Sequence, residues 1–101
     1  MTDDTLARLE RLETAEAARD VVYRYAAGLD ARDWDRIAAT LADDAVLVEA
    51  TGDVIGRAAI VASLQAALAS GFTPCHQVTG SRVDVTGPGE AVVESTIHYT
   101  I

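Results

Sequence analysis

The sequence contains no lysine, and its positive charge comes from eight arginines set among sixteen acidic residues. The resulting net charge of -8 disfavours nucleic acid as a partner, because binding a polyanion requires clustered Lys or Arg side chains that release counterions. Arginine used without lysine is typical of a GC-rich bacterial genome. We therefore expect a bacterial protein that does not bind nucleic acid.

Long hydrophobic runs are also missing. No apolar stretch approaches the ~20 residues that a membrane-spanning helix needs. The N-terminus, MTDDTLARLERLE, is charged and does not follow the pattern of a signal peptide. The sequence therefore predicts a cytoplasmic protein with no membrane partner.

Cysteine and histidine are scarce. A single cysteine, Cys75, excludes an internal disulfide, and it is more typical of a packed small side chain than of a nucleophile. The two histidines, His76 and His98, do not form a metal-ligand spacing with it, and the sequence has no Gly-rich phosphate loop. We therefore expect that the protein binds no metal ion and no cofactor.

Hydrophobic residues are abundant by contrast and make up 50% of the chain, which favours a folded domain over intrinsic disorder. A chain of 101 residues is expected to form one domain, residues 1–101. Its core should be small, because a chain of this size buries only about 60–68% of the surface that it exposes when unfolded.

Apolar residues recur at helical spacing from Thr5 to about Leu29. They predict one long helix, or two nearly collinear helices broken near Thr14, with one apolar stripe facing a core. The stripe consists of Leu6, Leu9, Leu12, Ala18, Val22, Tyr25, Ala26 and Leu29.

Two shorter helices are predicted after it. Gly28 indicates the end of the first helix, and Asp33 is placed to cap a second one that begins at Trp34 and runs to about Leu41. A third helix is predicted over residues 58–69, where apolar side chains again share one side.

Segments rich in β-branched residues predict strands over residues 45–51, 54–56, 76–86 and 90–101. The last two are joined by Gly87-Pro88-Gly89, which is typical of a hairpin turn. The order ααβ(β)αββ indicates an α+β domain with helices packed on one face of a curved antiparallel sheet.

Over nearly its whole length the sequence resembles the SnoaL-like branch of the nuclear-transport-factor-2-like superfamily. The motifs that carry this resemblance are Tyr25-x4-Asp30-x2-Asp33-Trp34-x8-Asp43-Asp44-Ala45-x-Leu47, then Gly56-x3-Ile60, then His76-x-Val78. The resemblance implies a cone-shaped sheet with three helices on one face. Family members continue with further strands that close the cone, so the chain is expected to lack the last strands of the family.

Resemblance to the dehydratases of this branch implies that Tyr25, Asp30 and His76 are catalytic. Loss of water from a β-hydroxy carbonyl compound needs a base for the acidic C–H, a donor to the enolate oxygen and a proton for the departing hydroxide. His76, oriented by Asp30, would serve as base and then as acid, and the Tyr25 hydroxyl would donate to the oxyanion.

A second resemblance, to the ketosteroid isomerases, runs without gaps from Tyr25 to Glu49. It implies that Tyr25 is an oxyanion donor and that Glu49 is the proton shuttle, where that family uses aspartate. A third partner in that family, a protonated aspartate, lies on a later strand that this chain lacks. Side chains alternate between the two faces of a strand, but both faces are partly apolar around Glu49, so it is open whether this residue faces a pocket or solvent. His98 lies on the same face of its strand as Glu94 and is expected to face away from the core.

Two functions remain open at this point. The first is a cofactor-independent, small-molecule lyase or isomerase that performs dehydratase-like acid/base chemistry on an apolar carbonyl or polyketide-like substrate in the cone. The second is a non-catalytic small-ligand-binding or dimerisation module of the same fold. Because the strand that runs to Ile101 would leave unpaired backbone groups at a sheet edge, we also expect a homodimer in which a partner covers this strand.

Overall fold

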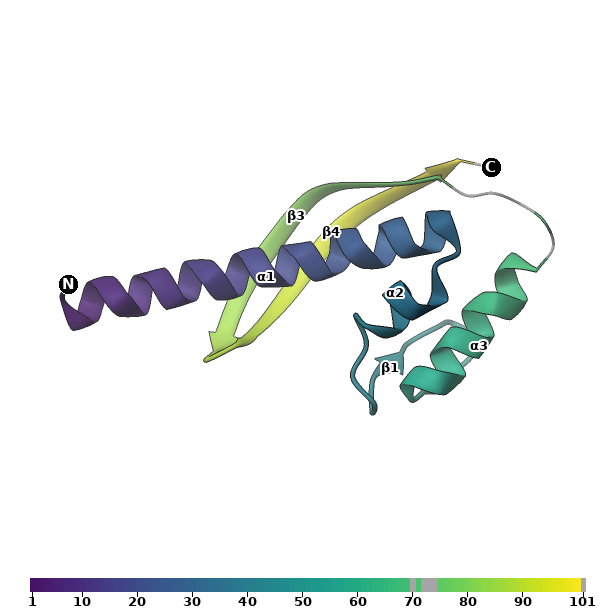
Figure 1. The fold of residues 1–101 in the computed structure, drawn as a ribbon, viewed down its shortest axis with the longest axis horizontal. Helices are drawn as coiled ribbons and strands as arrows, with labels where there is room; N and C mark the ends of the chain where they lie inside the picture. Colours follow the sequence, from purple (N-terminus) through teal and green to yellow (C-terminus); the bar gives the residue numbers. More distant parts are fainter. Residues whose placement is uncertain (70, 72–74, 101) are drawn as a thin grey trace.

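The computed structural model describes residues 1–69, 71 and 75–100 (Figure 1). Its helices and strands follow the predicted α+β order. In chain order they are α1 (Asp3–Ala31), α2 (Trp34–Ala38), β1 (Val46–Leu47), β2 (Val54–Ile55), α3 (Arg57–Leu68), β3 (Cys75–Gly87) and β4 (Glu90–Thr100).

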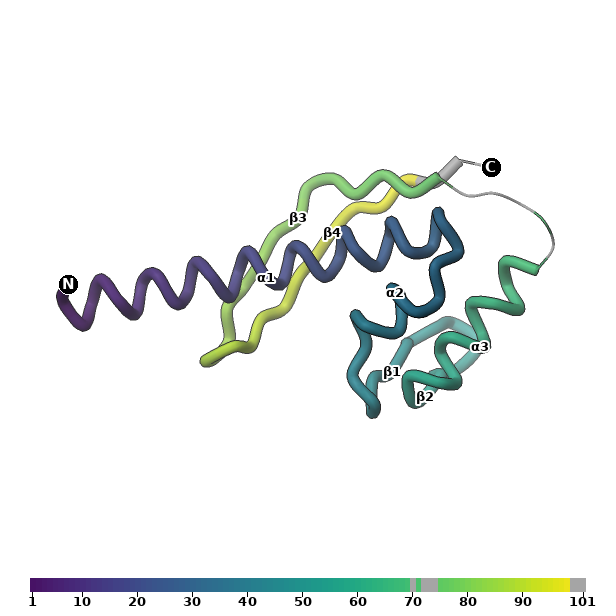
Figure 2. Tube along the Cα trace, in the orientation of Figure 1, coloured from purple at the N-terminus to yellow at the C-terminus, as the bar shows by residue number. Residues whose placement is uncertain are grey.

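The long helix α1 organises the molecule. The β3–β4 hairpin crosses it obliquely, while α2, α3 and the short β1–β2 pair lie together near its C-terminal end (Figures 1 and 2). Within the described residues the two antiparallel pairs, β1–β2 and β3–β4, form separate sheets with no strand in common. The sheet is therefore open rather than a closed barrel, and the cone that the resemblance implies is only partly walled.

A small apolar core forms where the three helices meet. Leu29, Ile37 and Leu68 are its buried centre, and they are covered by half-buried neighbours. These neighbours are Tyr25, Trp34, Leu41, Val61 and Leu64. Trp34 thus helps to fill the core, in agreement with its place just after the predicted helix cap.

Gly28 was expected to mark the end of the first helix, but α1 continues to Ala31 and is ended by Arg32, which has a φ of 51°. The structure gives a different reason for the glycine. A Cβ atom at position 28 would lie 2.8 Å from Cγ1 of Ile37, so only glycine lets α2 approach α1 this closely. The packing of these two helices, rather than the end of one of them, explains this residue.

The predicted core stripe is wrong for the first half of α1. The helix is continuous through Thr14, but Leu6, Leu9 and Leu12 are exposed, Leu12 by 66%. The periodicity predicted the helix correctly, but it could not predict which turns of the helix are covered by other elements. The N-terminal turns extend beyond the hairpin, so no described part of the chain packs on their apolar side chains (Figure 1). The stripe faces protein only in its second half, where Ala26 and Leu29 are buried.

Specific hydrogen bonds end α2 and begin α3. Asp33 caps α2 as expected, because its Oδ1 accepts from the backbone N–H of Arg36 at 3.1 Å. The helix ends at Ala38, earlier than predicted, as the chain tightens into turns. Arg57 opens α3 and holds this turn: its Nε donates to the carbonyl oxygen of Leu41, and its guanidinium pairs with Asp43, both at 2.8 Å.

The strand predicted over residues 45–51 is much shorter in the structure. Only Val46 and Leu47 form β1, because its partner β2 supplies only Val54 and Ile55 to the pairing. Without a partner strand, β propensity alone does not hold residues extended, and Val48 is 76% exposed. The prediction was right in type and wrong in length.

The strands of the β3–β4 hairpin are longer than β1 and β2, and their ends lie within one residue of the predicted ones. The predicted last residue, Ile101, lies outside the described residues. Partly buried and exposed side chains alternate along β3 on either side of its bulge, and His98 is exposed on β4 as expected. The pairing register shifts between Thr79 and Arg82, where Gly80 has a φ of 62°. This bulge lies on β3, where the hairpin bends across α1 (Figure 2).

Candidate active site

Among the residues that the structure describes, Asp30 and His76 are joined by several hydrogen bonds. Asp30 belongs to the last turn of α1, and His76 is the second residue of β3. The Asp30 carboxylate lies 2.5 Å from Nδ1 of the His76 ring. The backbone N–H of His76 also donates to both carboxylate oxygens, at 3.0 Å each. The end of a helix is thereby joined to the start of a strand, and the imidazole ring is fixed between them.

The electrostatics of this pair favour an ionised carboxylate. Partial burial by itself would raise the pKa of Asp30, but hydrogen bonds from the ring and backbone of His76 and the charge of the histidine outweigh it, so the pKa lies below its ordinary value. An ionised carboxylate accepts hydrogen bonds only, so the Nδ1 atom that contacts it carries the proton. In that tautomer Nε2 holds the lone pair and is the basic nitrogen of the ring.

The lowered pKa predicts how stability depends on pH. Because Asp30 is more acidic in the folded state than its ordinary value of 3.8, its carboxylate stabilises the fold above about pH 4, and this contribution is lost as the pH falls through the lower folded-state pKa. Urea unfolding should therefore show that Asp30→Asn is less stable than the wild type near neutral pH, with a difference that shrinks below about pH 4.

A matched control for this experiment is Asp53→Asn, in the exposed turn between β1 and β2. It should stay within about 0.5 kcal/mol of the wild type throughout. A destabilisation by Asp30→Asn that is equally large at acidic pH would contradict the assignment, since it would come from packing rather than from charge.

Tyr25 and Glu49, the other two predicted site residues, influence each other through charge. Tyr25 is half-buried against the core, and burial raises the pKa of its hydroxyl, with a smaller contribution from the negative charge of Glu49. The tyrosine therefore keeps its proton at neutral pH and can donate a hydrogen bond. Glu49 is exposed and lies two residues beyond the end of β1, so solvent rather than a pocket surrounds it.

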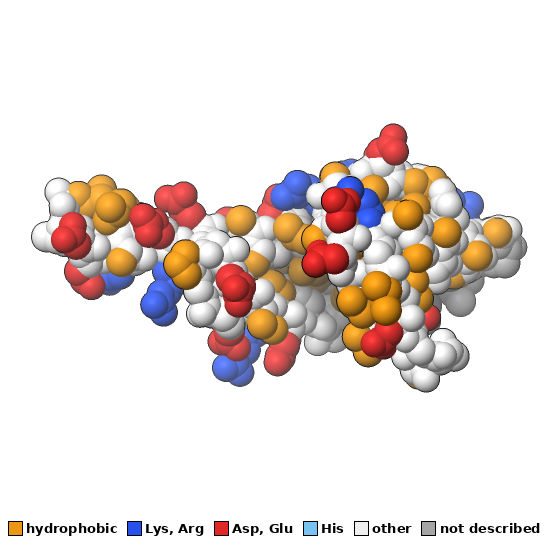
Figure 3. Space-filling view, turned by 90° about the horizontal axis from the view of Figure 1, so that it is seen from below, with side chains coloured by type: hydrophobic (Ala, Val, Ile, Leu, Met, Phe, Trp, Pro, Cys, Tyr) orange, Lys and Arg blue, Asp and Glu red, His pale blue; other side chains and the backbone are white. Residues whose placement is uncertain are grey.

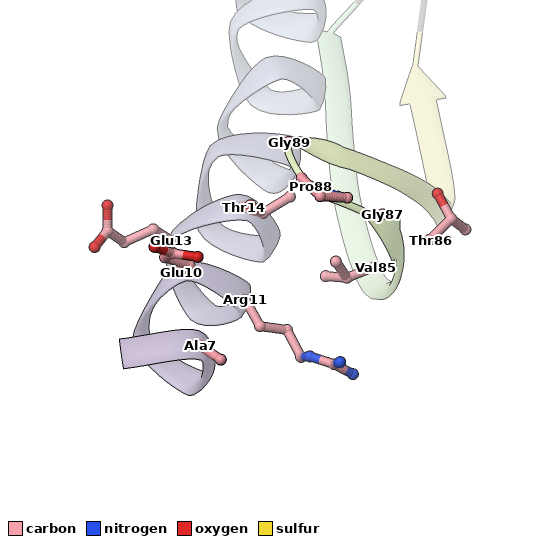
Figure 4. Close-up of a pocket in the computed structure, with 10 residues that line it drawn as sticks. All are labelled: Ala7, Glu10, Arg11, Glu13, Thr14, Val85, Thr86, Gly87, Pro88 and Gly89. Carbon is pink, nitrogen blue, oxygen red and sulfur yellow. The ribbon is translucent and has the colours of Figure 1, made fainter. Parts of the chain in front are cut away.

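The structure thus brings Asp30 into contact with His76, whereas Glu49 acts on Tyr25 through its charge. The hollows that it shows along α1 are lined by other residues. One hollow, of about 480 Å³, lies between the first half of α1 and the hairpin turn. In Figure 4 the Arg11 side chain extends beneath this turn, whereas Glu10 and Glu13 point away from it. We did not predict this space, which depends on where the hairpin crosses the helix.

A second hollow, of about 590 Å³, continues from the first toward the middle of α1. Its lining consists mostly of small apolar residues. The alanines of α1 leave room beside the helix, and they are the sequence signal that could have predicted this hollow. The lining residues are Glu13, Thr14, Ala17, Ala18, Val21, Val22, Gly89, Ala91 and Val93.

In the part of the chain that the structure describes, we searched for metal-ligand clusters and for membrane-spanning helices. No group of three or more His, Cys, Asp or Glu side chains there is placed to hold a metal ion. Nor is any described helix both long and apolar enough to cross a bilayer. Acidic side chains are spread along the molecule, and hydrophobic ones gather on the face near β1 and β2, where Val46 and Ile55 are exposed (Figure 3).

Comparison with known proteins decides the family. The model of the SnoaL-like domain matches residues 10–100 of the chain. The chain belongs to the SnoaL-like domain family. This confirms the resemblance on which the expected site rests, and the Asp30–His76 pair lies inside the matched region. Among curated proteins, none matches the chain.

Solved structures share the fold of this SnoaL-like chain at low sequence identity. ActVI-ORFA from Streptomyces coelicolor aligns with a TM-score of 0.69 and 20% identity, over 79% of this chain and 63% of its own. A protein of unknown function with a cystatin-like fold from Nostoc punctiforme aligns with a TM-score of 0.67 and 24% identity, over 98% of this chain and 68% of its own.

A third structure, Aln2 from a Streptomyces species, aligns with a TM-score of 0.59 and 22% identity, over 79% of this chain and 72% of its own. At these identities the likeness shows the fold alone. The SnoaL-like chain spans less than two thirds of the length of ActVI-ORFA, so the fold of that protein includes segments with no counterpart here.

Proposed function

We propose that this SnoaL-like protein is a cofactor-independent lyase or isomerase that acts on a small, apolar carbonyl or polyketide-like molecule. The observation that supports this proposal is the hydrogen-bonded pair of Asp30 and His76, which directs a basic ring nitrogen away from the carboxylate. A histidine held in one tautomer by an ionised carboxylate is a recurring general base.

In the dehydratase reaction, Nε2 of His76 would remove the acidic proton next to the carbonyl group of a β-hydroxy carbonyl substrate. The electrons of the broken C–H bond move to the carbonyl oxygen and form an enolate. Asp30 stabilises the imidazolium that results, since its carboxylate already contacts Nδ1. The enolate then re-forms the carbonyl and expels hydroxide, which takes the proton from Nε2 and leaves as water.

The neutral Tyr25 hydroxyl is the proposed donor to the enolate oxygen. Its raised pKa supports this role, because a tyrosine that stays protonated can donate when negative charge develops. Glu49, which acts on Tyr25 through its charge, is the base in the isomerase alternative. Its exposure favours His76, because excluding water strengthens the interactions within a site, and the His76 side chain is only 16% exposed.

Proton abstraction can be tested without knowing the final product. We expect the wild-type protein in D₂O to catalyse the uptake of deuterium at the carbon between the two functional groups of a β-hydroxy ketone, as followed by NMR. Asp30→Asn should slow this uptake, whereas Asp53→Asn should not. Uptake at the background rate with every β-hydroxy ketone of a graded size series would contradict the proposal.

A second candidate, a non-catalytic small-ligand-binding module, is favoured by the apolar hollow of about 590 Å³ beside α1. This volume is within the range of small-molecule sites, about 300–1,000 Å³. The deuterium experiment separates the two candidates, because a binding module would shift the ligand's NMR signals without exchanging its protons.

A further inference from the structure

The bulge in β3 changes which of its side chains face α1. Before the bulge, His76 and Val78 are partly buried, and the contact of His76 with Asp30 shows that this face is turned toward the helix. After the bulge the alternation changes phase, so that Ser81 is partly buried and Arg82 is exposed. In a regular strand side chains alternate between the faces, and Arg82 would face the helix instead. The extra residue thus brings a serine onto the face that carries His76.

This serine meets a second one across the hairpin. The Oγ atoms of Ser81 and Ser95 lie 2.9 Å apart, within hydrogen-bond distance. Ser95 is partly buried on β4 and shares its face with Ala91 and Val93, which line the apolar hollow beside α1. The two serines therefore place a polar group between this hollow and His76.

The serine pair has hydrogen-bonding capacity to spare. Two hydroxyl groups carry two protons and four lone pairs, and the bond between them uses one proton and one lone pair. Within the described residues the hydroxyls of Ser81 and Ser95 have each other as their hydrogen-bond partners, so one proton remains to be donated. The neighbouring Arg82 is exposed on the opposite face. The pair therefore suits a neutral carbonyl or hydroxyl oxygen rather than a carboxylate or phosphate, which favour a cationic partner.

We infer that Ser81 and Ser95 bind a second, neutral oxygen of the substrate and so select an elongated molecule. This inference rests on the proposed function, which places the reacting carbonyl compound at His76. His76 pairs with Tyr99, which is four residues from Ser95 along β4, so the two sites are roughly 13 Å apart along the strand.

The separation of the two sites sets the length of the substrate. A hydrogen bond of about 3 Å at each end leaves roughly 7–13 Å between the reacting group and the second oxygen. A small β-hydroxy ketone is too short to reach both sites. An extended or fused-ring polyketide-like molecule with an oxygen at its far end is long enough, and the apolar side chains around the serines would contact its carbon skeleton.

A set of ketones tests this site by binding alone. The first is a naphthyl methyl ketone with a hydroxyl on the ring far from the carbonyl group, and the second lacks this hydroxyl. By NMR titration, the wild type should bind the first about 2- to 10-fold more tightly, as expected for one neutral hydrogen bond. A third ketone, with the hydroxyl on the ring that carries the carbonyl group, should bind no better than the second.

The double variant Ser81→Ala/Ser95→Ala should lose the preference for the first ketone and bind the second within about twofold of the wild type. Both serines are replaced because either hydroxyl alone could donate to the ligand. The matched control is Thr79→Val/Thr96→Val, which removes two directly opposite hydroxyls from the exposed face of the same hairpin and should keep the preference. A serine pair that only stabilises the hairpin would change the affinity for the two ketones equally.

Three results would overturn the inference: a wild type that binds neither ketone at millimolar concentration, a wild type without the preference, or a double variant that retains it. The deuterium experiment reports separately on the proposed function. Deuterium uptake without the preference would overturn the serine site alone, whereas the preference without uptake would overturn the acid/base reaction and leave the serines as part of a binding site.

Discussion

Replacing His76 with glutamine should lower the turnover of a β-hydroxy carbonyl substrate by about 10²- to 10⁴-fold, the range that a general base contributes. Glutamine keeps an N–H group that can donate to the Asp30 carboxylate, and the backbone N–H of His76 that contacts both carboxylate oxygens is unchanged. What the variant lacks is a basic nitrogen. The loss should appear in kcat, because the substrate would still bind while proton abstraction fails.

Two comparisons make this result specific. Gln77→Ala, at the exposed neighbouring position of β3, should keep wild-type turnover. Glu49→Gln should also keep it if His76 is the base, whereas under the isomerase alternative Glu49→Gln abolishes turnover and His76→Gln does not. Full activity in both His76→Gln and Glu49→Gln would mean that neither residue is the base. A thermal melt of each variant shows whether the fold is retained.

Replacing Ile37 with alanine should lower the free energy of unfolding by about 2–5 kcal/mol, the cost of removing a large apolar side chain from a core. Ile37 is fully buried, and it packs with Leu29 and Leu68 at the point where the three helices meet. Gly28 brings α1 so close that little space remains for relaxation around this side chain. In a domain of about 100 residues each kcal/mol lowers the Tm by about 4–8 °C.

The matched control is Ile55→Ala, the same chemical change at a position that is 71% exposed. It should cost less than about 1 kcal/mol, the span of intrinsic strand preferences. Equal losses in the two variants would show that the small helical core is not what stabilises the domain. Urea unfolding gives both values, provided that each transition is two-state.

Local sequence signals predicted most of this fold. Helical periodicity located α1 and α3, the Asp33 cap located α2, and the Gly87-Pro88-Gly89 turn located the hairpin. The failures occurred where structure depends on a distant partner. The length of β1 is set by β2 rather than by its own β-branched residues, and the exposure of Leu6 depends on how far the hairpin reaches along α1.

The candidate site was predicted less directly. No periodicity or spacing brings Asp30 near His76, and only the family resemblance suggested that they meet; in the structure, hydrogen bonds join them. The catalytic roles of Tyr25, Asp30, His76 and Glu49 stay predictions. The apolar hollow beside α1 could not be predicted, because it depends on the crossing angle between a helix and a hairpin that are far apart in sequence.

The contact between Asp30 and His76 also bears on the order of folding. It joins residues that are 46 positions apart, so the whole segment containing α2, β1, β2 and α3 must be closed into a loop before it can form. Closing such a loop costs conformational entropy that contacts within α1 or within the hairpin do not incur. Helix and hairpin can therefore appear in partly folded chains, whereas the proposed acid/base pair exists only once this loop of the chain has been closed.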